Sequence, residues 1–121
     1  MDRHFVILKH SRLGQAHFDL MLETDDCLLT WRIDAPPEDL TTKPVIAEKI
    51  FDHDKKFLTY EGPVNKGAGS VEIADAGELK IETHSPNRIA LTIKGEIARG
   101  PFTLTRKQDA KWQLAHDKNR P

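Results

Sequence analysis

Two histidines and an aspartate lie close together near the start of the chain: His10, His17 and Asp19. From His17 to Glu23 polar and apolar residues alternate with the period of two that is typical of a β-strand, so His17 and Asp19 share one face. His10 ends the preceding apolar run, across a loop that contains Gly14, and can fold back toward them. Two imidazoles and a carboxylate that converge are usual ligands of divalent transition metals. The spacing therefore predicts a metal site.

The same residues also fit a simpler interpretation. A His-x-Asp pair is common on solvated sheet faces, and His10 is compatible with a loop-edge histidine that has no partner. Glu23, on the same predicted face, either orients a ligand imidazole or a nearby basic side chain, or is an exposed carboxylate. Three residues without a further fixed offset form a weak motif, so the pattern leaves both interpretations open.

A second candidate is His53, which lies between Asp52 and Asp54. We expect these flanking carboxylates to raise the pKa of the imidazole and to favour its protonated form. Such an imidazolium can bind a phosphate or protonate a leaving oxygen, although the residues alone favour an ordinary turn histidine. The remaining histidines are not assigned to the site: His4, His84 and His116.

The elements that must position these residues are short strands separated by turn-type residues. No segment sustains a period near 3.6, and two helical turns are expected, at 36–40 and 54–58. Short strands at even spacing predict an all-β fold, either an antiparallel sandwich or a barrel. The predicted strands are Phe5–Lys9, His17–Glu23, Leu28–Ile33, Val45–Phe51, Ser70–Ile73, Leu79–Thr83, Ile89–Lys94, Phe102–Arg106 and Trp112–Ala115.

The inward faces of these strands are expected to build the core. Trp31 and Trp112 are assigned to it rather than to base stacking, because both lie inside apolar strands. The predicted core consists of Phe5, Ile7, Phe18, Leu20, Leu22, Leu29, Trp31, Ile33, Ile46, Val71, Ile73, Leu79, Ile81, Ile89, Leu91, Ile93, Phe102, Leu104, Trp112 and Leu114.

The length of 121 residues suits one domain over residues 1–121, with the polar tail 116–121 expected to fray. The one cysteine, Cys27, excludes an intramolecular disulfide, fits a reducing compartment and is interpreted as a structural thiol. No apolar stretch is long enough to span a membrane and no signal-peptide pattern is present. We therefore expect a cytoplasmic protein.

Charge excludes a globally basic surface for nucleic acid, because the formal net charge is -1. A polyanion would have to be held by a local basic rim. Lys9 and Arg12 flank the predicted metal loop, Arg32 follows a strand tryptophan, and Lys55 follows His53. Together these side chains can bind phosphate, although each alone also fits a solvated surface charge.

An ordered set of motifs resembles the 3'-phosphoesterase domain of bacterial and archaeal DNA ligase D, an end-joining repair enzyme. The strand that ends in Lys9-His10 is similar to an apolar strand of that family, and His17-Phe18-Asp19 is similar to its His-aromatic-Asp segment. Asp52-His53 matches its Asp-His pair. The other similar segments are Leu28–Trp31, Tyr60–Gly62, Gly67–Val71, Lys94–Glu96, Gly100–Leu104 and Trp112–Leu114. The set implies a free-standing version of that domain, without polymerase and ligase domains.

The resemblance implies a small antiparallel β barrel with a concave active-site face. It implies a manganese-dependent enzyme, with Zn²⁺ or another divalent cation also compatible, that removes a 3'-terminal ribonucleoside and then the remaining 3'-phosphate. His10, His17 and Asp19 fall on the metal ligands of that family, and His53 falls on a catalytic histidine that contacts the scissile phosphate. The implied partners are DNA or RNA-capped DNA 3' ends and end-joining repair proteins, with no membrane.

The chain departs from that family at three polar positions. Met21 stands where the family has a phosphate-gripping arginine, Phe57 where it often has a catalytic tyrosine, and Val45 near another phosphate-binding arginine. The metal ligands are thus retained better than the phosphate clamp. Two alternatives therefore stand beside the enzyme: a non-catalytic module that binds DNA ends or a partner, and a phosphoesterase whose substrate is not nucleic acid.

Overall fold

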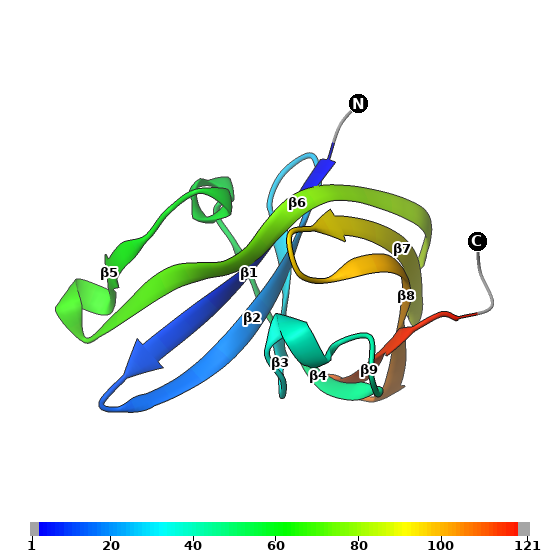
Figure 1. Ribbon diagram of the computed structural model, residues 1–121. Helices are drawn as coiled ribbons and strands as arrows, with labels where there is room; N and C mark the ends of the chain where they lie inside the picture. Colours follow the sequence, from blue (N-terminus) through cyan, green and yellow to red (C-terminus); the bar gives the residue numbers. More distant parts are fainter. Residues whose placement is uncertain (1–2, 119–121) are drawn as a thin grey trace.

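The computed structural model describes residues 3–118, and in that range the fold is all-β, as predicted. Eight strands close into an antiparallel barrel in the order β1-β2-β3-β4-β9-β8-β7-β6, with β6 pairing back to β1, and β5 pairs with β6 outside the barrel (Figure 1). The strands are β1 Arg3–Arg12, β2 Gln15–Glu23, β3 Leu28–Ile33, β4 Val45–His53, β5 Gly62–Val64, β6 Gly69–Ser85, β7 Arg88–Gly95, β8 Arg99–Gln108 and β9 Lys111–His116.

Three short 3-10 helices join the strands within the described residues: η1 (Pro37–Asp39), η2 (Lys55–Leu58) and η3 (Asn65–Gly67). The first two coincide with the predicted helical turns, and the third was not predicted. Asp54 caps η2, because its side chain accepts a hydrogen bond from the Lys56 N–H.

The predicted loop between His10 and His17 is wrong. β1 and β2 instead continue to Arg12 and Gln15 and are joined by Leu13 and Gly14 alone. Both turn residues have positive φ, 52° and 78°, as a two-residue type I′ hairpin turn requires. His10 therefore pairs with His17 directly across the ladder and does not have to fold back from a flexible loop.

A single 17-residue strand, β6, replaces the two strands that were predicted on either side of Ala76-Gly77. Gly77 serves close packing and not a turn, because a Cβ on it would collide with the carbonyl oxygen of Lys94. β6 contacts β1, β5 and β7, and its register shifts opposite β1 and β7 let the strand bend around the barrel.

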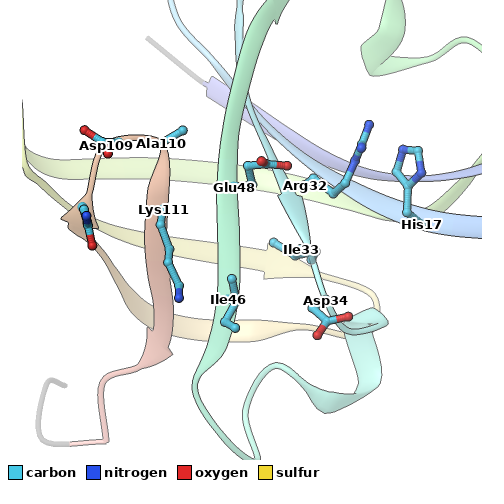
Figure 2. Close-up of a pocket in the computed structure, with 10 residues that line it drawn as sticks. His17, Arg32, Ile33, Asp34, Ile46, Glu48, Asp109, Ala110 and Lys111 are labelled. Atoms are coloured by element: carbon cyan, nitrogen blue, oxygen red, sulfur yellow. The ribbon is translucent and has the colours of Figure 1, made fainter.

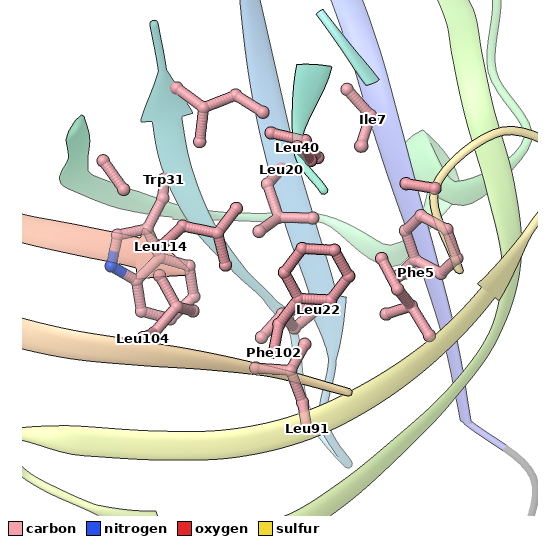
Figure 3. Close-up of a cluster of buried hydrophobic side chains, with 14 of the residues drawn as sticks. Phe5, Ile7, Leu20, Leu22, Trp31, Leu40, Leu91, Phe102, Leu104 and Leu114 are labelled. Atoms are coloured by element: carbon pink, nitrogen blue, oxygen red, sulfur yellow. The ribbon is translucent and has the colours of Figure 1, made fainter. Parts of the chain in front are cut away.

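The main core fills the barrel (Figure 3). Most predicted core residues are confirmed, including Trp31 and Trp112, whose rings meet edge to face at 5.5 Å. The prediction that Ile46 belongs to the core is wrong. Its side chain is 53% exposed, because Val45 and Ala47 take the inward positions of β4. The labelled side chains of the core are Phe5, Ile7, Leu20, Leu22, Trp31, Leu40, Leu91, Phe102, Leu104 and Leu114.

A second apolar cluster lies on the outer face of β1 and β2. Its buried members are Val6, Leu8, Met21, Leu28 and Val71, and it is covered by the segment 57–64 through Phe57, Leu58, Tyr60 and Val64. Val71 and Ile73, which were predicted in the barrel core, belong to this second cluster. The cluster covers one part of this outer face and leaves the part that carries His10, His17 and Asp19 outside it.

The prediction that residues 116–121 fray is wrong for His116. His116 belongs to β9 and its ring contacts Phe102 at 5.1 Å, while the Asp117 N–H donates to the Pro101 carbonyl. The last three residues of that predicted tail, 119–121, lie outside the described residues. Across residues 3–118, no helix has the length and apolar character that crossing a membrane requires.

A buried carboxylate ties β6 to the turn between β7 and β8. Asp75 is 3% exposed and accepts hydrogen bonds from four backbone N–H groups, those of Ala76, Glu96, Ile97 and Ala98, at 2.8–3.2 Å. Hydrogen bonds to a charged acceptor are about twice as strong as neutral ones, so this residue fixes the β7–β8 turn against β6.

Asp75→Asn should lower the free energy of unfolding by about 3 kcal/mol, because an amide replaces the charge and turns an NH₂ group toward backbone donors. Urea denaturation followed by circular dichroism measures the change. Asp26→Asn, at an exposed position, is the matched control and should change stability by less than about 0.5 kcal/mol. Equal stability of the two variants would contradict the anchoring role.

Candidate functional site

The first hairpin brings His10, His17 and Asp19 together on the outer face of the barrel. His10 Nδ1 lies 3.1 Å from His17 Nε2, and His17 Nε2 lies 3.4 Å from Asp19 Oδ2. One ligand atom from each residue lies within 4.8 Å of the other two. The ladder explains this convergence: His10 is the partner of His17, and Asp19 is two residues further along the same face.

The donor atoms of this cluster fit a cation. Asp19 is buried at 5% exposure, and its Oδ1 has no hydrogen-bond partner within residues 3–118. A buried carboxylate oxygen without a hydrogen bond is costly. Arg32 Nε, 3.8 Å from Oδ1, is too far away to donate one, and a bound cation would satisfy the oxygen. Two imidazole nitrogens and one carboxylate oxygen are a donor set that suits Mn²⁺ or Zn²⁺ and leaves positions open for water or phosphate.

Burial holds His10 in its neutral form. Desolvation is the main cause that lowers the pKa of this imidazole below 6.5, and the neighbouring His17 lowers it further. Gly69 on β6 makes room for the ring, since a Cβ there would come within 2.9 Å of His10 Nε2. Metal ions bind the neutral imidazole, so the environment favours the ligating form near neutral pH.

His53, the last residue of β4, lies against β3. Its Nδ1 is 2.8 Å from Thr30 Oγ1, and the Thr30 hydroxyl donates to the Leu28 carbonyl at 3.1 Å. Because the Thr30 hydroxyl donates its proton to the Leu28 carbonyl, its oxygen accepts a hydrogen bond from His53 Nδ1–H. This arrangement selects the tautomer in which Nε2 carries the lone pair.

The expected rise in the pKa of His53 is wrong. Burial lowers the pKa below 6.5 and outweighs the nearby carboxylates, of which Asp19 has the largest effect. Two aromatic rings contribute to this burial: Phe51 stacks on the imidazole at 4.6 Å and Phe57 meets it edge-on at 5.6 Å. Asp54, one of the two flanking acids, is engaged in capping η2.

The predicted basic rim is only partly assembled at the cluster. Arg32 Nε lies 3.8 Å from Asp19 Oδ1, and Arg12 shares the outer face of β1 with His10. Lys9 points to the opposite face of β1, where its Nζ lies 3.9 Å from Glu72.

Glu23 does not contact the ligand histidines. Its Oε1 accepts a hydrogen bond from the His4 N–H at 2.9 Å and lies 3.1 Å from His4 Nδ1. Its Oε2 lies 3.6 Å from Lys55 Nζ, which is the second of the two contacts expected for it. Glu23 therefore pairs with Lys55, whose role in phosphate binding stays a prediction.

Two hollows meet at His17 and Arg32. The hairpin hollow, of about 660 Å³, is lined by both ligand histidines, Arg12, Arg32 and the residues of the turn, and no carboxylate of residues 3–118 lines it. The β4 hollow, of about 600 Å³, extends the other way over β3, β4 and the β8–β9 turn (Figure 2). The first hollow is cationic and the second carries charges of both signs.

The three departures from the ligase D pattern have different surroundings. Met21 is buried in the second apolar cluster, and Phe57 packs against that cluster beside His53. Val45 lies in the barrel core, so its side chain faces away from the site. Polar groups near the cluster include Arg12 and Arg32, which line the hairpin hollow, and His53, whose pKa is affected by Asp19.

Sequence reasoning missed Thr30 and Phe51. Thr30 is fully buried although polar, and a hydroxyl inside an apolar strand was the available signal. Phe51 is 73% exposed on the strand that carries His53, and no local pattern distinguishes such a residue from a core phenylalanine.

Lowering the pH from about 7.5 to about 5.5 should destabilise the metal-free protein. The folded-state pKa values of His10 and His53 lie below 6.5, so the unfolded chain takes up these protons first and the free energy of unfolding falls as the pH drops through that value. Glu23, whose pKa is also lowered, contributes stability that is lost only below 4.5.

Thermal unfolding at both pH values tests this dependence. The double variant His10→Gln/His53→Gln should show a smaller drop in Tm than the wild type, while the exposed His84→Gln serves as the matched control. A drop of full size in the double variant would show that other groups cause the pH dependence.

The sequence of this chain is similar to known proteins. The family model described as the DNA Ligase D 3'-phosphoesterase domain matches residues 9–106. The multifunctional non-homologous end joining protein LigD of Mycobacterium bovis is 29% identical over 119 residues, which cover 93% of this chain and 15% of that protein. The figures are the same for the LigD repair protein of Mycobacterium tuberculosis strain H37Rv.

LigD of Mycolicibacterium smegmatis is 29% identical over 126 residues, covering 93% of this chain and 16% of that protein. The chain thus spans about one sixth of the length of these relatives. Because the family model matches most of the chain, this protein belongs to the DNA ligase D 3'-phosphoesterase domain family.

Proposed function

We propose that this protein is a metal-dependent phosphoesterase that trims DNA 3' ends, removing a terminal ribonucleoside or a 3'-phosphate, in repair by end joining. The observation that carries the proposal is the cluster of three ligand atoms within 4.8 Å, at the edge of a hollow lined by two arginines. A phosphodiester needs both features, a cation against its oxygens and positive charge around it.

His10, His17 and Asp19 would hold the cation, for which we propose Mn²⁺, with Zn²⁺ or another divalent ion also suited to this donor set. A bound divalent ion withdraws charge from a phosphate and lowers the pKa of a coordinated water. Two features of this chain support the assignment: neutral His10, and Asp19 Oδ1, which accepts no hydrogen bond within residues 3–118.

Arg12 and Arg32 take the place of the missing phosphate clamp. Both line the hairpin hollow, and Arg32 lies between the cluster and the β4 hollow. A guanidinium offers paired N–H donors that match two phosphate oxygens. Met21 and Phe57 cannot offer such donors, so the charge of the substrate falls to these two arginines.

His53 serves as the proton carrier. The hydroxyl of Thr30 holds Nδ1–H, so Nε2 is the nitrogen that accepts a proton from the attacking water and returns it to the leaving oxygen. The reaction adds OH to phosphorus and H to the oxygen that departs. An anionic phosphate nearby favours the imidazolium and offsets the burial that otherwise lowers the pKa of His53.

A second candidate function is a non-catalytic module that binds DNA ends or an end-joining protein. The observation in its favour is the apolar pair Met21 and Phe57 at positions where the family carries polar groups. The two candidates differ in turnover, and a module that binds an end-joining protein also differs in its partner.

A trimming assay separates the candidates. A 5'-labelled primer–template that ends in a 3'-ribonucleotide or a 3'-phosphate should be shortened or dephosphorylated only when Mn²⁺ is added. His17→Ala should reduce the rate by at least about 100-fold, because the cation loses one of three ligands. His84→Ala, at an exposed position, is the matched control and should keep full activity.

Calorimetric titration with Mn²⁺ gives an independent measurement, and His17→Ala should abolish the binding heat. Binding of Mn²⁺ and of DNA without trimming would favour the non-catalytic module. Trimming that persists in His17→Ala, or without any divalent ion, would contradict the proposed site.

Arg32→Gln should lower kcat/KM by roughly 10- to 100-fold, the range expected when a charged hydrogen bond of about 1.5–3 kcal/mol to the transition state is lost. Initial rates on the 3'-phosphate substrate measure it. Arg88→Gln, exposed on β7, is the matched control. Equal rates for the two variants would remove Arg32 from the phosphate contacts.

A further inference from the structure

We propose that the β4 hollow binds the nucleoside on the leaving side of the scissile phosphate, with Ile46 in contact with its base. This inference rests on the proposed function and assigns a second part of the substrate to a surface that the phosphate chemistry does not use. It concerns the outer face of β3 and β4 beyond Arg32.

The two hollows are continuous with each other. His17 and Arg32 line both hollows, so a phosphate held at the cluster lies at the boundary between them. Figure 2 shows the lining side chains that follow one another from His17 and Arg32 past Glu48 and Ile46 to Lys111. A dinucleotide centred on the cluster therefore has one neighbour directed into each hollow.

The two hollows differ in the charges that line them. The β4 hollow is lined by three carboxylates, of Asp34, Glu48 and Asp109, and by two cations, Arg32 and Lys111. Such a lining disfavours further phosphates, while its carboxylates can accept hydrogen bonds from sugar hydroxyls and base amino groups. The hairpin hollow has the opposite character and suits the phosphate-bearing strand. The two linings therefore assign the DNA strand to the hairpin hollow and the departing nucleoside to the β4 hollow.

The β4 hollow also contains an exposed apolar side chain, that of Ile46. Ile46 is 53% exposed in the β4 hollow, whereas the side chain of Ile33 faces the barrel core. Aliphatic side chains in a polar-rimmed hollow provide a contact for the flat face of a base. Of the residues 3–118, the other large apolar side chains that are exposed are Leu13 in the hairpin hollow, Phe51 on His53, and Ile97.

The chemistry supplies an internal comparison. When water cleaves the phosphodiester, the P–O5' bond breaks, phosphorus gains OH, and the departing nucleoside takes a proton on O5'. When a 3'-phosphate is removed, inorganic phosphate departs and no nucleoside lies beyond it. Contacts in the β4 hollow therefore matter for the first reaction and not for the second.

The test compares the two reactions in each variant. Ile46→Asn should lower kcat/KM for nucleoside removal about tenfold relative to its own kcat/KM for 3'-phosphate removal, the scale of a lost apolar contact. Glu48→Gln should shift the same ratio in the same direction. Ile97→Asn, which replaces an isoleucine of similar exposure (45%) away from the hollow, should leave the ratio at the wild-type value.

Equilibrium binding of the metal-free protein gives a second readout. Fluorescence anisotropy should show that Ile46→Asn weakens binding of a primer–template ending in a ribonucleotide more than binding of one ending in a 3'-phosphate. An unchanged ratio in both assays, or an equal shift in Ile97→Asn, would overturn the inference. A wild-type protein that performs neither reaction would instead overturn the proposed function, so the two failures are distinguishable.

Discussion

The direct pairing of His10 with His17 across a two-residue turn is the constraint on which the site depends. A type I′ turn fixes the register of a hairpin, and a slip of one residue would move every side chain of β2 to the opposite face. Both turn residues here have positive φ, as that turn requires, with Leu13 at 52° despite its Cβ. The tightness of the turn therefore decides that two imidazoles and a carboxylate share one face.

The remainder of the outer face is divided between apolar cover and open polar surface. The segment 57–64 folds over Val6, Leu8 and Met21 and leaves the end near the first hairpin uncovered. His53 lies at the boundary, with Thr30 on one side and Phe57 on the other. The same cover that completes a small core thus also lowers the pKa of His53, so packing and chemistry are coupled at this residue.

Much of the fold was predictable because it rests on local patterns. The alternation from His17 to Glu23 predicted both faces of β2, and turn residues predicted most strand ends. Ile46 was misplaced because Val45, Ile46 and Ala47 are all apolar and carry no alternation, so only pairing with β9 sets the inward positions. The pKa of His53 was misjudged because its neighbours in sequence are acids, whereas its surroundings in space are largely aromatic rings.

The long strand β6 contributes to both apolar clusters. Val71 near its start is buried in the outer cluster, and Leu79 further along is buried inside the barrel. β1 and β2 likewise alternate between the clusters, with Ile7 and Leu20 inside and Leu8 and Met21 outside. These shared strands tie the two clusters together, so we expect barrel and covering segment to melt as one cooperative unit. The face that carries His10, His17 and Asp19 then persists for as long as the whole domain is folded.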